Sequence, residues 1–237
     1  MGTIRINSKN TKMVAHRGAG KVWVENSLPA FQNSAKCSYW GIETDIHCTK
    51  DGKYIIIHDD TPLRVTGIDG ITVEETDFET LRNLHLLGLE GDEARLPTLE
   101  EYVTACKSGD KYCVLELKNQ MPEKNIKEII EQINSMDYLD RTVFISFSYT
   151  NMSILKKLVP DQAAQFLISQ KRFEECIELV RSNPMDIDID HRCVTKELID
   201  EMHGLGVKVN TWTVNDPEEA EALTEMGIDF ITTDILE

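Results

Sequence analysis

Strand-like and helical patterns alternate along almost all of the 237 residues, and this alternation constrains the fold more than any other feature of the chain. Alternating β and α segments build βαβ units, which form a parallel sheet covered by helices. A (β/α)8 barrel takes about 250 residues, and the chain is close to that length. We therefore predict the α/β class and a (β/α)8 TIM barrel, with residues 1–237 forming a single domain.

The expected elements follow from apolar periodicity and from helix-capping residues. The expected strands are Met13–Arg17, Ile42–Cys48, Tyr54–His58, Tyr112–Lys118, Thr142–Phe147, Ala164–Ser169, Asp186–His191, Lys208–Val214 and Phe230–Asp234. The expected helices are Ser27–Tyr39, Leu99–Lys107, Glu123–Met136, Tyr149–Leu158, Phe173–Arg181, Lys196–Leu205 and Pro217–Met226. Thr98 followed by Glu101 is typical of a capping box, so a helix should begin directly after Thr98.

One segment departs from the alternation. The pair Asp51-Gly52 is a strong tight-turn signal, so Ile42–His58 is expected to form a hairpin rather than a βα unit. Residues 59–95 are polar and irregular, with one short helical piece at Phe78–Leu86. We predict that 59–95 form a small insertion after the second strand, at the barrel mouth. Without the returning strand Tyr54–His58, eight strands remain for the barrel.

The last strand ends close to Glu237, so we expect the final helix of the barrel to be short or missing. The gap would then be covered by the N-terminal residues or by a partner chain. A homo-oligomer is compatible with the second alternative.

Charge and composition limit the classes of partner. The formal net charge of −16 argues against nucleic acid and against an anionic membrane surface, because both attract basic patches. No apolar run resembles a signal peptide or a membrane span, so we expect a cytoplasmic protein without stable membrane insertion. The six cysteines contain no CxxC pair and are expected to be reduced thiols.

Three carboxylates are candidate metal ligands. Glu43 and Asp45 lie two apart on an expected strand, so both side chains point to the same face. Glu116 lies within an otherwise apolar strand, where a charge needs a partner. Three carboxylates without cysteine favour a hard divalent cation, Mg²⁺ or Ca²⁺. The alternatives are a solvated edge strand for the first two, and for Glu116 an ion pair with Lys118 or an arginine.

Two histidines are candidate acid–base groups. His16 and His58 each end an apolar strand, and the carboxyl ends of barrel strands deliver catalytic residues to one face. Imidazole exchanges protons near neutral pH, so such a pair could deprotonate a nucleophile and protonate a leaving alkoxide. Arg17 and Lys118 stand beside candidate residues and could contact phosphate oxygens. The alternative is hydrogen-bonded rim histidines and salt-bridged surface cations.

Several further residues are weaker candidates. Trp212 ends a strand at the same face and either walls a pocket or belongs to the core. His47 shares a strand face with Glu43 and Asp45 and could reach the site. The remaining weak candidates are His85, His191 and His203. Asp186, Asp188 and Asp190 place three acids on one strand face, an arrangement for which the sequence offers no explanation.

Taken in chain order, these motifs resemble the glycerophosphodiester phosphodiesterase family over about Val14 to Leu236. The matching pieces are His16-Arg17-Gly18, Glu25-Asn26-Ser27, Ala30-Phe31, Gly41-Ile42-Glu43-Thr44-Asp45, Thr49-Lys50-Asp51-Gly52, His58-Asp59-Asp60, Arg64, Leu96-Pro97-Thr98-Leu99-Glu100-Glu101, Glu116-Leu117-Lys118, Ser146-Phe147, Trp212-Thr213-Val214-Asn215 and Thr233-Asp234. Val24 replaces the proline that usually precedes Glu25 in the family.

The resemblance implies a TIM barrel that hydrolyses glycerophosphodiesters, which are small molecules, to glycerol 3-phosphate and an alcohol. It implies a divalent cation on Glu43, Asp45 and Glu116. It also implies acid–base roles for His16 and His58, phosphate contacts for Arg17 and Lys118, and a pocket position for Trp212. Which histidine is the acid stays open, as does the choice between water and the glycerol 2-hydroxyl as the nucleophile.

Two other functions fit the same fold. A phospholipase D-like or phosphoinositide-type lipid phosphodiesterase should carry an apolar or basic rim, whereas the stretch Thr61–Arg95 is acidic and mostly polar. A non-catalytic glycerol-phosphate-binding barrel should have lost a histidine or a metal ligand, and all five are present. Hydrolysis of soluble diesters is therefore favoured.

Overall fold

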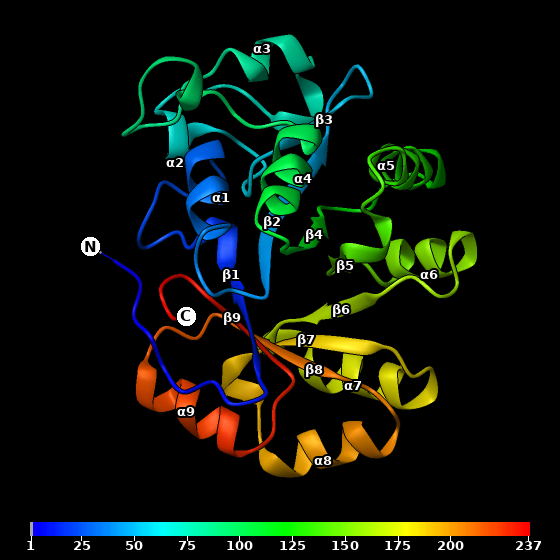
Figure 1. Ribbon diagram of the computed structural model, residues 1–237. Coiled ribbons are helices and arrows are strands. Elements are labelled where there is room, and N and C mark those ends of the chain that lie inside the picture. Colours follow the sequence, from blue (N-terminus) through cyan, green and yellow to red (C-terminus); the bar gives the residue numbers. More distant parts are fainter. Residues whose placement is uncertain (1) are drawn as a thin grey trace.

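The structure, a computed structural model, describes residues 2–237 and contains a closed parallel barrel (Figure 1). Around the barrel the strand order is β1-β9-β8-β7-β6-β5-β4-β2, and pairing of β1 with β2 closes the ring. The barrel strands are β1 (Lys12–Ala15), β2 (Gly41–Cys48), β4 (Tyr112–Leu117), β5 (Thr142–Ser146), β6 (Ala164–Ile168), β7 (Asp186–Asp190), β8 (Val209–Trp212) and β9 (Phe230–Thr233). The predicted (β/α)8 fold is confirmed.

Helices cover the outside of the barrel (Figure 1). They are α1 (Leu28–Ser34), α4 (Leu99–Ser108), α5 (Glu123–Ser135), α6 (Tyr149–Leu158), α7 (Phe173–Ser182), α8 (Lys196–Gly204) and α9 (Pro217–Glu225). The predicted capping box of α4 is present, because the Thr98 hydroxyl accepts from the Glu101 amide and the Glu101 carboxylate accepts from the Thr98 amide. Helix α1 ends earlier than predicted, since tighter turns replace the α-helical bonding after Ala35.

A hairpin and a small folded segment follow β2. Strand β3 (Tyr54–Ile56) pairs antiparallel with β2, as the Asp51-Gly52 turn predicts. Residues 59–95 contain α2 (Leu63–Thr66) and α3 (Phe78–Arg82), and α3 packs against β3. Their apolar side chains pack with β3 in a separate cluster of Ile55, Ile57, Val73, Leu81, Leu86 and Leu96. The assignment of 59–95 as an insertion to a single domain stays a prediction.

Short 3-10 helices connect several elements, at His16–Gly18, Val73–Glu75, Gly91–Ala94, Leu139–Arg141, Gln170–Arg172 and His191–Cys193. Within residues 2–237 no helix is both long enough and apolar enough to cross a membrane. All six cysteines are free thiols.

The two ends of the described chain lie together (Figure 1). Ile4 and Leu236 form a parallel bridge, and the Ile6 amide donates to the Glu237 carbonyl at 2.9 Å. The Glu237 carboxylate accepts from the Ser38 amide at 3.0 Å, which joins this edge to the loop before β2. Among the described residues no helix follows β9. The N-terminal residues instead lie against the segment that follows β9, which is one of the two alternatives predicted for covering the gap.

The barrel interior is apolar at its amino end. Trp40 stacks on Tyr112 with ring centroids 4.2 Å apart, and both rings pack with the inner cluster of Val14, Val114, Val143, Ile145, Leu167 and Phe230. These packed apolar side chains exclude water from the amino ends of the strands. Charged side chains inside the barrel therefore gather nearer the carboxyl ends of the strands, where barrel active sites form.

A buried tyrosine ties α4 to the two strands that carry the candidate metal ligands. The Tyr102 hydroxyl donates to the carbonyl of Ile42 on β2 at 2.6 Å and accepts from the amide of Val114 on β4 at 2.9 Å. The Tyr102 side chain is fully buried. This hydroxyl satisfies two backbone groups that water cannot reach.

We expect Tyr102→Phe to lower the free energy of unfolding by about 1–3 kcal/mol, because the Val114 amide is left buried without an acceptor. Tyr39→Phe is the matched control, since the Tyr39 hydroxyl is equally buried and has no hydrogen-bond partner among the described residues. Its unfolding free energy should stay within about 0.5 kcal/mol of the parent. Urea denaturation measures both, and equal losses in the two variants would contradict this role of Tyr102.

Candidate active site

A cavity of about 310 Å³ opens at the carboxyl ends of the barrel strands. This volume is at the lower end of the range of roughly 300–1,000 Å³ that is usual for small-molecule sites. The residues lining the cavity are His16, Arg17, Glu43, His58, Glu116, Ile145, Phe147, Leu167, Asp188, Trp212, Thr213 and Thr232. Most of the predicted site residues therefore share one cavity.

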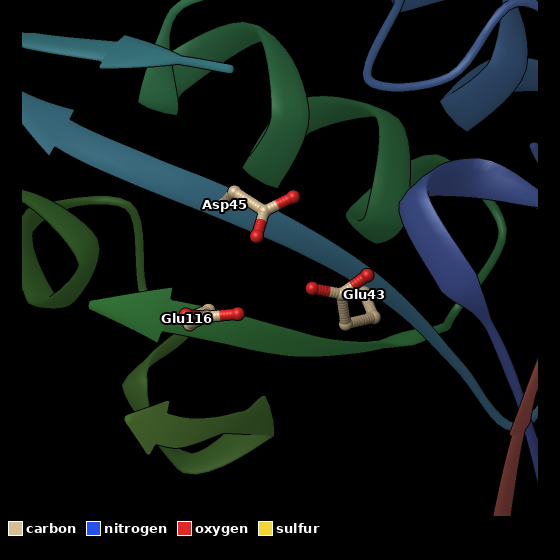
Figure 2. Close-up of side chains that lie close together, drawn as sticks. All are labelled: Glu43, Asp45 and Glu116. Carbon is tan, nitrogen blue, oxygen red and sulfur yellow. The ribbon is translucent and has the colours of Figure 1, made fainter. Parts of the chain in front are cut away.

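Three carboxylates converge at one side of this cavity (Figure 2). Glu43 and Asp45 project from the same face of β2, and Glu116 projects from β4 in register with Asp45. One oxygen of each lies within 4.8 Å of the others, and the three residues are 3%, 1% and 7% exposed. The strand spacing predicted the shared face of the first two, and the parallel pairing of β4 with β2 brings in the third.

Two cationic side chains contact the carboxylates. The Lys118 ammonium lies 3.0 Å from Glu116 Oε1 and 3.4 Å from Asp45 Oδ1. The Arg17 Nε atom lies 3.6 Å from Asp45 Oδ2. The ion pair predicted as an alternative for Glu116 is thus present, but two cations face three buried carboxylates.

Burial sets the protonation of this cluster. It raises the pKa of Glu43 well above the ordinary value and that of Glu116 to about 8, and the neighbouring Asp45 charge raises both further. Burial opposes ionisation of Asp45 as well, but Lys118 and Arg17 hold its pKa below the ordinary range. Without another positive charge, the cluster keeps protons that it would otherwise lose at neutral pH.

The donor set fits a hard divalent cation. All three ligands are carboxylates, which Mg²⁺ and Ca²⁺ prefer. Asp45 Oδ1 is buried and has no hydrogen-bond partner among the described residues. The other oxygen, Oδ2, accepts from Asn26 Nδ2 at 2.8 Å, which fixes the plane of the carboxylate. The cluster therefore offers a cation an oriented oxygen whose one charged neighbour is the Lys118 ammonium 3.4 Å away.

Each candidate histidine is oriented by an aspartate. His16 Nδ1 lies 2.7 Å from Asp234 Oδ1, and His58 Nδ1 lies 2.7 Å from Asp59 Oδ1. A carboxylate only accepts, so Nδ1 carries the proton in both contacts and Nε2 is left to exchange a proton with a ligand. Burial lowers the pKa of His58, and the nearby Lys118 and Arg17 charges lower it further against the opposing pull of Asp45.

The turn after β1 places His16 and Arg17 through an uncommon backbone. Arg17 has φ 50° and Gly18 has φ 76°. A Cβ at Gly18 would lie 2.9 Å from Ala30 Cβ, so only glycine fits between this turn and α1. The Arg17 amide donates to Glu43 Oε2 at 2.8 Å, which connects the turn to the carboxylate cluster.

A charged network supports the turn from the side of residues 59–95. The Arg17 guanidinium donates to Glu25 at 3.0 Å, and Arg64 bridges Glu25 and Asp59 at 2.7 and 2.6 Å. Hydrogen bonds from Arg64 and His58 outweigh burial and lower the pKa of Asp59 to about 2. The family resemblance in the sequence gave Glu25 and Arg64 only as motif residues. In the structure they connect the loop that carries His16 with the loop that carries His58.

The opposite wall of the cavity is aromatic and carries one further acid. Trp212 lines the cavity, as expected, and packs edge-to-face on Phe147 with ring centroids 5.7 Å apart. Asp188 on β7 is 1% exposed, and its Oδ1 has no hydrogen-bond partner among the described residues. Burial, together with the Glu116 charge, raises the pKa of Asp188 well above the ordinary value.

The weaker candidates lie elsewhere. His47 is buried beside Glu74, 3.1 Å from its Oε1, and is not among the residues that line the cavity. His191 pairs with Glu219, and His203 pairs with Asp229 on the surface. His85 forms an isolated antiparallel β-bridge with Arg95 in the segment after β3.

Sequence patterns did not assign the two orienting aspartates. Asp59 follows His58 directly, a signal that could have been used. Asp234 is 218 positions from His16, and only the closed barrel brings them together.

Comparison with known proteins agrees with the resemblance seen in the sequence. The model of the glycerophosphoryl diester phosphodiesterase family matches residues 16–237. A glycerophosphodiester phosphodiesterase of Caldanaerobacter subterraneus is 29% identical over 230 residues, which cover 94% of each chain.

Solved structures show the same fold. A glycerophosphodiester phosphodiesterase of Thermotoga maritima has a TM-score of 0.77 and 22% identity, with 94% of each chain covered. A phosphodiesterase of Oleispira antarctica, determined in complex with the product sn-glycerol-3-phosphate, has a TM-score of 0.79 and 24% identity, covering 97% of this chain and 95% of its own.

The raised pKa of Glu116 predicts how the metal-free protein responds to pH. A carboxyl whose folded pKa lies above its unfolded value holds more protons when folded, so stability falls as the pH rises between 4.5 and about 8. Each pKa unit corresponds to about 1.4 kcal/mol, so a loss of at least that size is expected in thermal or urea unfolding.

The matched variants are Glu116→Gln, which should weaken this dependence while Glu43 still contributes to it, and Glu100→Gln on the exposed face of α4, which should preserve it. Saturating Mg²⁺ or Ca²⁺ should also flatten it in the parent. A parent protein whose stability stays constant or rises over this range would contradict the described charge balance.

Proposed function

The chain belongs to the glycerophosphoryl diester phosphodiesterase family, and from this membership we propose that it hydrolyses glycerophosphodiesters to glycerol 3-phosphate and an alcohol. The reaction requires a divalent cation, Mg²⁺ or Ca²⁺. His16 and His58 serve as the general acid and base. The substrate is a small molecule, and the protein acts in the cytoplasm.

One observation carries this proposal. The carboxylates of Glu43, Asp45 and Glu116 meet at the side of a cavity that His16 and His58 also reach or line. A divalent cation held by these carboxylates would supply Lewis-acid and template chemistry at a phosphate oxygen and would offset the negative field that otherwise repels an anionic substrate.

Arg17 and Lys118 bind and orient the phosphate. Arg17 lines the cavity, and its guanidinium is held there between Glu25 and Asp45. Lys118 already lies against Asp45 and Glu116 and adds a point charge at the same place. Together they hold the phosphorus between the two histidines.

The histidines move the protons. One imidazole removes a proton from the attacking hydroxyl of water or of the glycerol C2 carbon as the new oxygen–phosphorus bond forms. The other gives its Nε2 proton to the alkoxide as the old phosphorus–oxygen bond breaks. Attack by the glycerol hydroxyl gives a cyclic phosphate that a water then opens. Asp234 and Asp59 hold the two rings and stabilise the imidazolium forms.

A lipid diester is the second candidate, and one observation favours it. Residues 59–95 expose three apolar side chains, Leu63, Ile68 and Leu87, at 46%, 46% and 59%. These residues would suit contact with an acyl chain or a micelle surface. Comparing glycerophosphocholine with micellar lysophosphatidylcholine separates the two candidates.

A substrate panel with Mg²⁺, Ca²⁺ or EDTA tests the proposal. We expect release of glycerol 3-phosphate from a soluble diester with at least one of the two ions, and loss of that activity in EDTA that is restored by adding the ion back. Hydrolysis that persists in EDTA, or the absence of hydrolysis with either ion, would refute it.

We expect His16→Ala and His58→Ala each to lower kcat by about 10²–10⁴-fold, because each removes a group that exchanges a proton in the transition state. His203→Ala is the control, since His203 lies on the outer surface of α8, and should keep the parent rate. Thermal melting establishes that all three variants fold. Turnover by a folded His16 or His58 variant at the parent rate would remove that histidine from the mechanism.

A further inference from the structure

Asn151 is a buried polar side chain that the proposed reaction does not use. It lies in the first turn of α6, is fully buried, and is not among the residues that line the cavity. Its Nδ2 atom donates to the Asn119 carbonyl at 2.6 Å and to the Ser146 hydroxyl at 3.1 Å. Its Oδ1 atom accepts from the Met121 amide at 2.9 Å. The side chain therefore binds main-chain groups that follow β4 rather than those of its own helix.

The start of α6 does not need this side chain. The Ser148 hydroxyl caps the helix by accepting from the Asn151 amide at 3.3 Å. This bond uses the main chain of Asn151 and leaves its side chain to reach across to the end of β4. Asparagine also disfavours a helix interior, because its side chain competes for main-chain groups. An asparagine at this position therefore points to a role outside the helix.

The segment that Asn151 holds is a tight turn directly after Lys118. The Lys118 amide donates to the Ile46 carbonyl of β2 at 3.1 Å, and the next residue, Asn119, has φ 53°. This left-handed conformation is unfavourable for a residue other than glycine, so it persists where the surroundings enforce it. The bonds from Asn151 to the Asn119 carbonyl and from the Met121 amide to Asn151 span the turn. They fix the path of the chain where it leaves the sheet.

The turn has a second attachment on its outer side. The exposed Asn119 side chain donates to Asp60 Oδ1 and to Glu74 Oε1, each at 3.0 Å. Water competes for such exposed bonds, whereas the bonds made by Asn151 are buried. Met121 is 3% exposed, so removal of the Asn151 side chain leaves the Met121 amide buried and unpaired. An unpaired buried amide is costly, which favours movement of the turn toward water.

Lys118 transmits such a movement to the candidate active site. Its ammonium lies 3.0 Å from Glu116 Oε1 and 3.4 Å from Asp45 Oδ1, and its side chain is 12% exposed. A lysine side chain is long and flexible, so the place of its ammonium depends on where the main chain holds its Cα atom. Because Lys118 directly precedes the turn, a shift of the turn moves the ammonium away from the two carboxylates.

We propose that Asn151 is a positioning residue that fixes the Lys118 ammonium between Glu116 and Asp45. It touches neither the substrate nor the cation, and it acts through the turn at Asn119. The inference rests on the proposed function, in which Lys118 binds the phosphate of the diester. It assigns a part in substrate binding to a helix residue outside the cavity.

The test compares Asn151→Ala with Ser148→Ala, which removes the cap of the same helix and leaves the bonds to the turn after β4 in place. Both variants lose buried hydrogen bonds and should melt at a lower temperature than the parent. Only Asn151→Ala should raise KM for glycerophosphocholine, by about 10-fold, because a charged hydrogen bond to the phosphate is weakened. An unchanged KM in the folded variant, or an equal rise in Ser148→Ala, would contradict the inference.

A double-mutant cycle tests whether Asn151 acts through Lys118. In the Lys118→Ala background, Asn151→Ala should raise KM no further, because the group that it displaces is already gone. Effects of the two substitutions that multiply independently would count against the inference. If Asn151→Ala does not fold, Asn151→Ser, which keeps a hydroxyl in place of the amide, enters the same cycle.

Binding of Ca²⁺ separates a positioning role from a general loss of structure. Moving a positive charge away from Glu116 and Asp45 should leave the affinity for Ca²⁺ equal to that of the parent or higher, because like charges repel. Calorimetry of the folded Asn151→Ala variant measures this affinity. A variant that binds both Ca²⁺ and the diester more weakly would show that Asn151 supports the whole site and does not position Lys118.

Crystal structures of the parent and of Asn151→Ala give a readout that does not depend on turnover. In the variant the Lys118 ammonium should lie beyond about 4 Å from both carboxylates, the limit of an ion pair. If the parent hydrolyses no diester while Asn151→Ala still displaces Lys118, the proposed function fails and the positioning role stands. If diesters are hydrolysed and Lys118 keeps its place in the variant, the inference alone fails.

Discussion

The repulsion among Glu43, Asp45 and Glu116 is the constraint on which the site depends. Like charges this close and this deeply buried cannot all ionise without positive partners. Lys118 and Arg17 supply part of the compensation, as their distances of 3.0–3.6 Å show. The rest is left to protons or to a divalent ion, and this deficit is the reason why we propose the cluster as a cation site rather than as a closed salt bridge.

The barrel keeps the repulsion from relaxing. Two of the acids are fixed on β2 and the third on β4, and these strands are paired along six residues of each. The stacked rings of Trp40 and Tyr112 close the amino end of the barrel. The carboxyl end stays open, and there the loops after β1 and β3 bring two imidazoles to the cavity that the carboxylates border. The rigid strands thus hold the charged carboxylates, while the loops hold the two histidines that we propose as proton-exchanging groups.

Local pattern predicted several features that depend on local geometry. Period-two spacing placed Glu43 and Asp45 on one face, strand ends placed His16 and His58 at one mouth, and a tight-turn pair placed β3. Contacts that depend on closure of the ring had no such signal, as with His16 and Asp234, which are 218 positions apart. Asp186, Asp188 and Asp190 are equivalent in the pattern. Only packing shows that Arg192 reaches Asp190 and that nothing reaches Asp188 among the described residues.

Anomalous diffraction from crystals soaked in Mn²⁺, a stand-in for the divalent ion, tests most directly whether the three carboxylates bind a cation. A single peak bounded by oxygens of Glu43, Asp45 and Glu116, facing His16 and His58 across the cavity, is the expected result. A peak elsewhere, with no ion between the three carboxyl groups at saturating metal, would show that protons balance this cluster and that its burial serves another purpose.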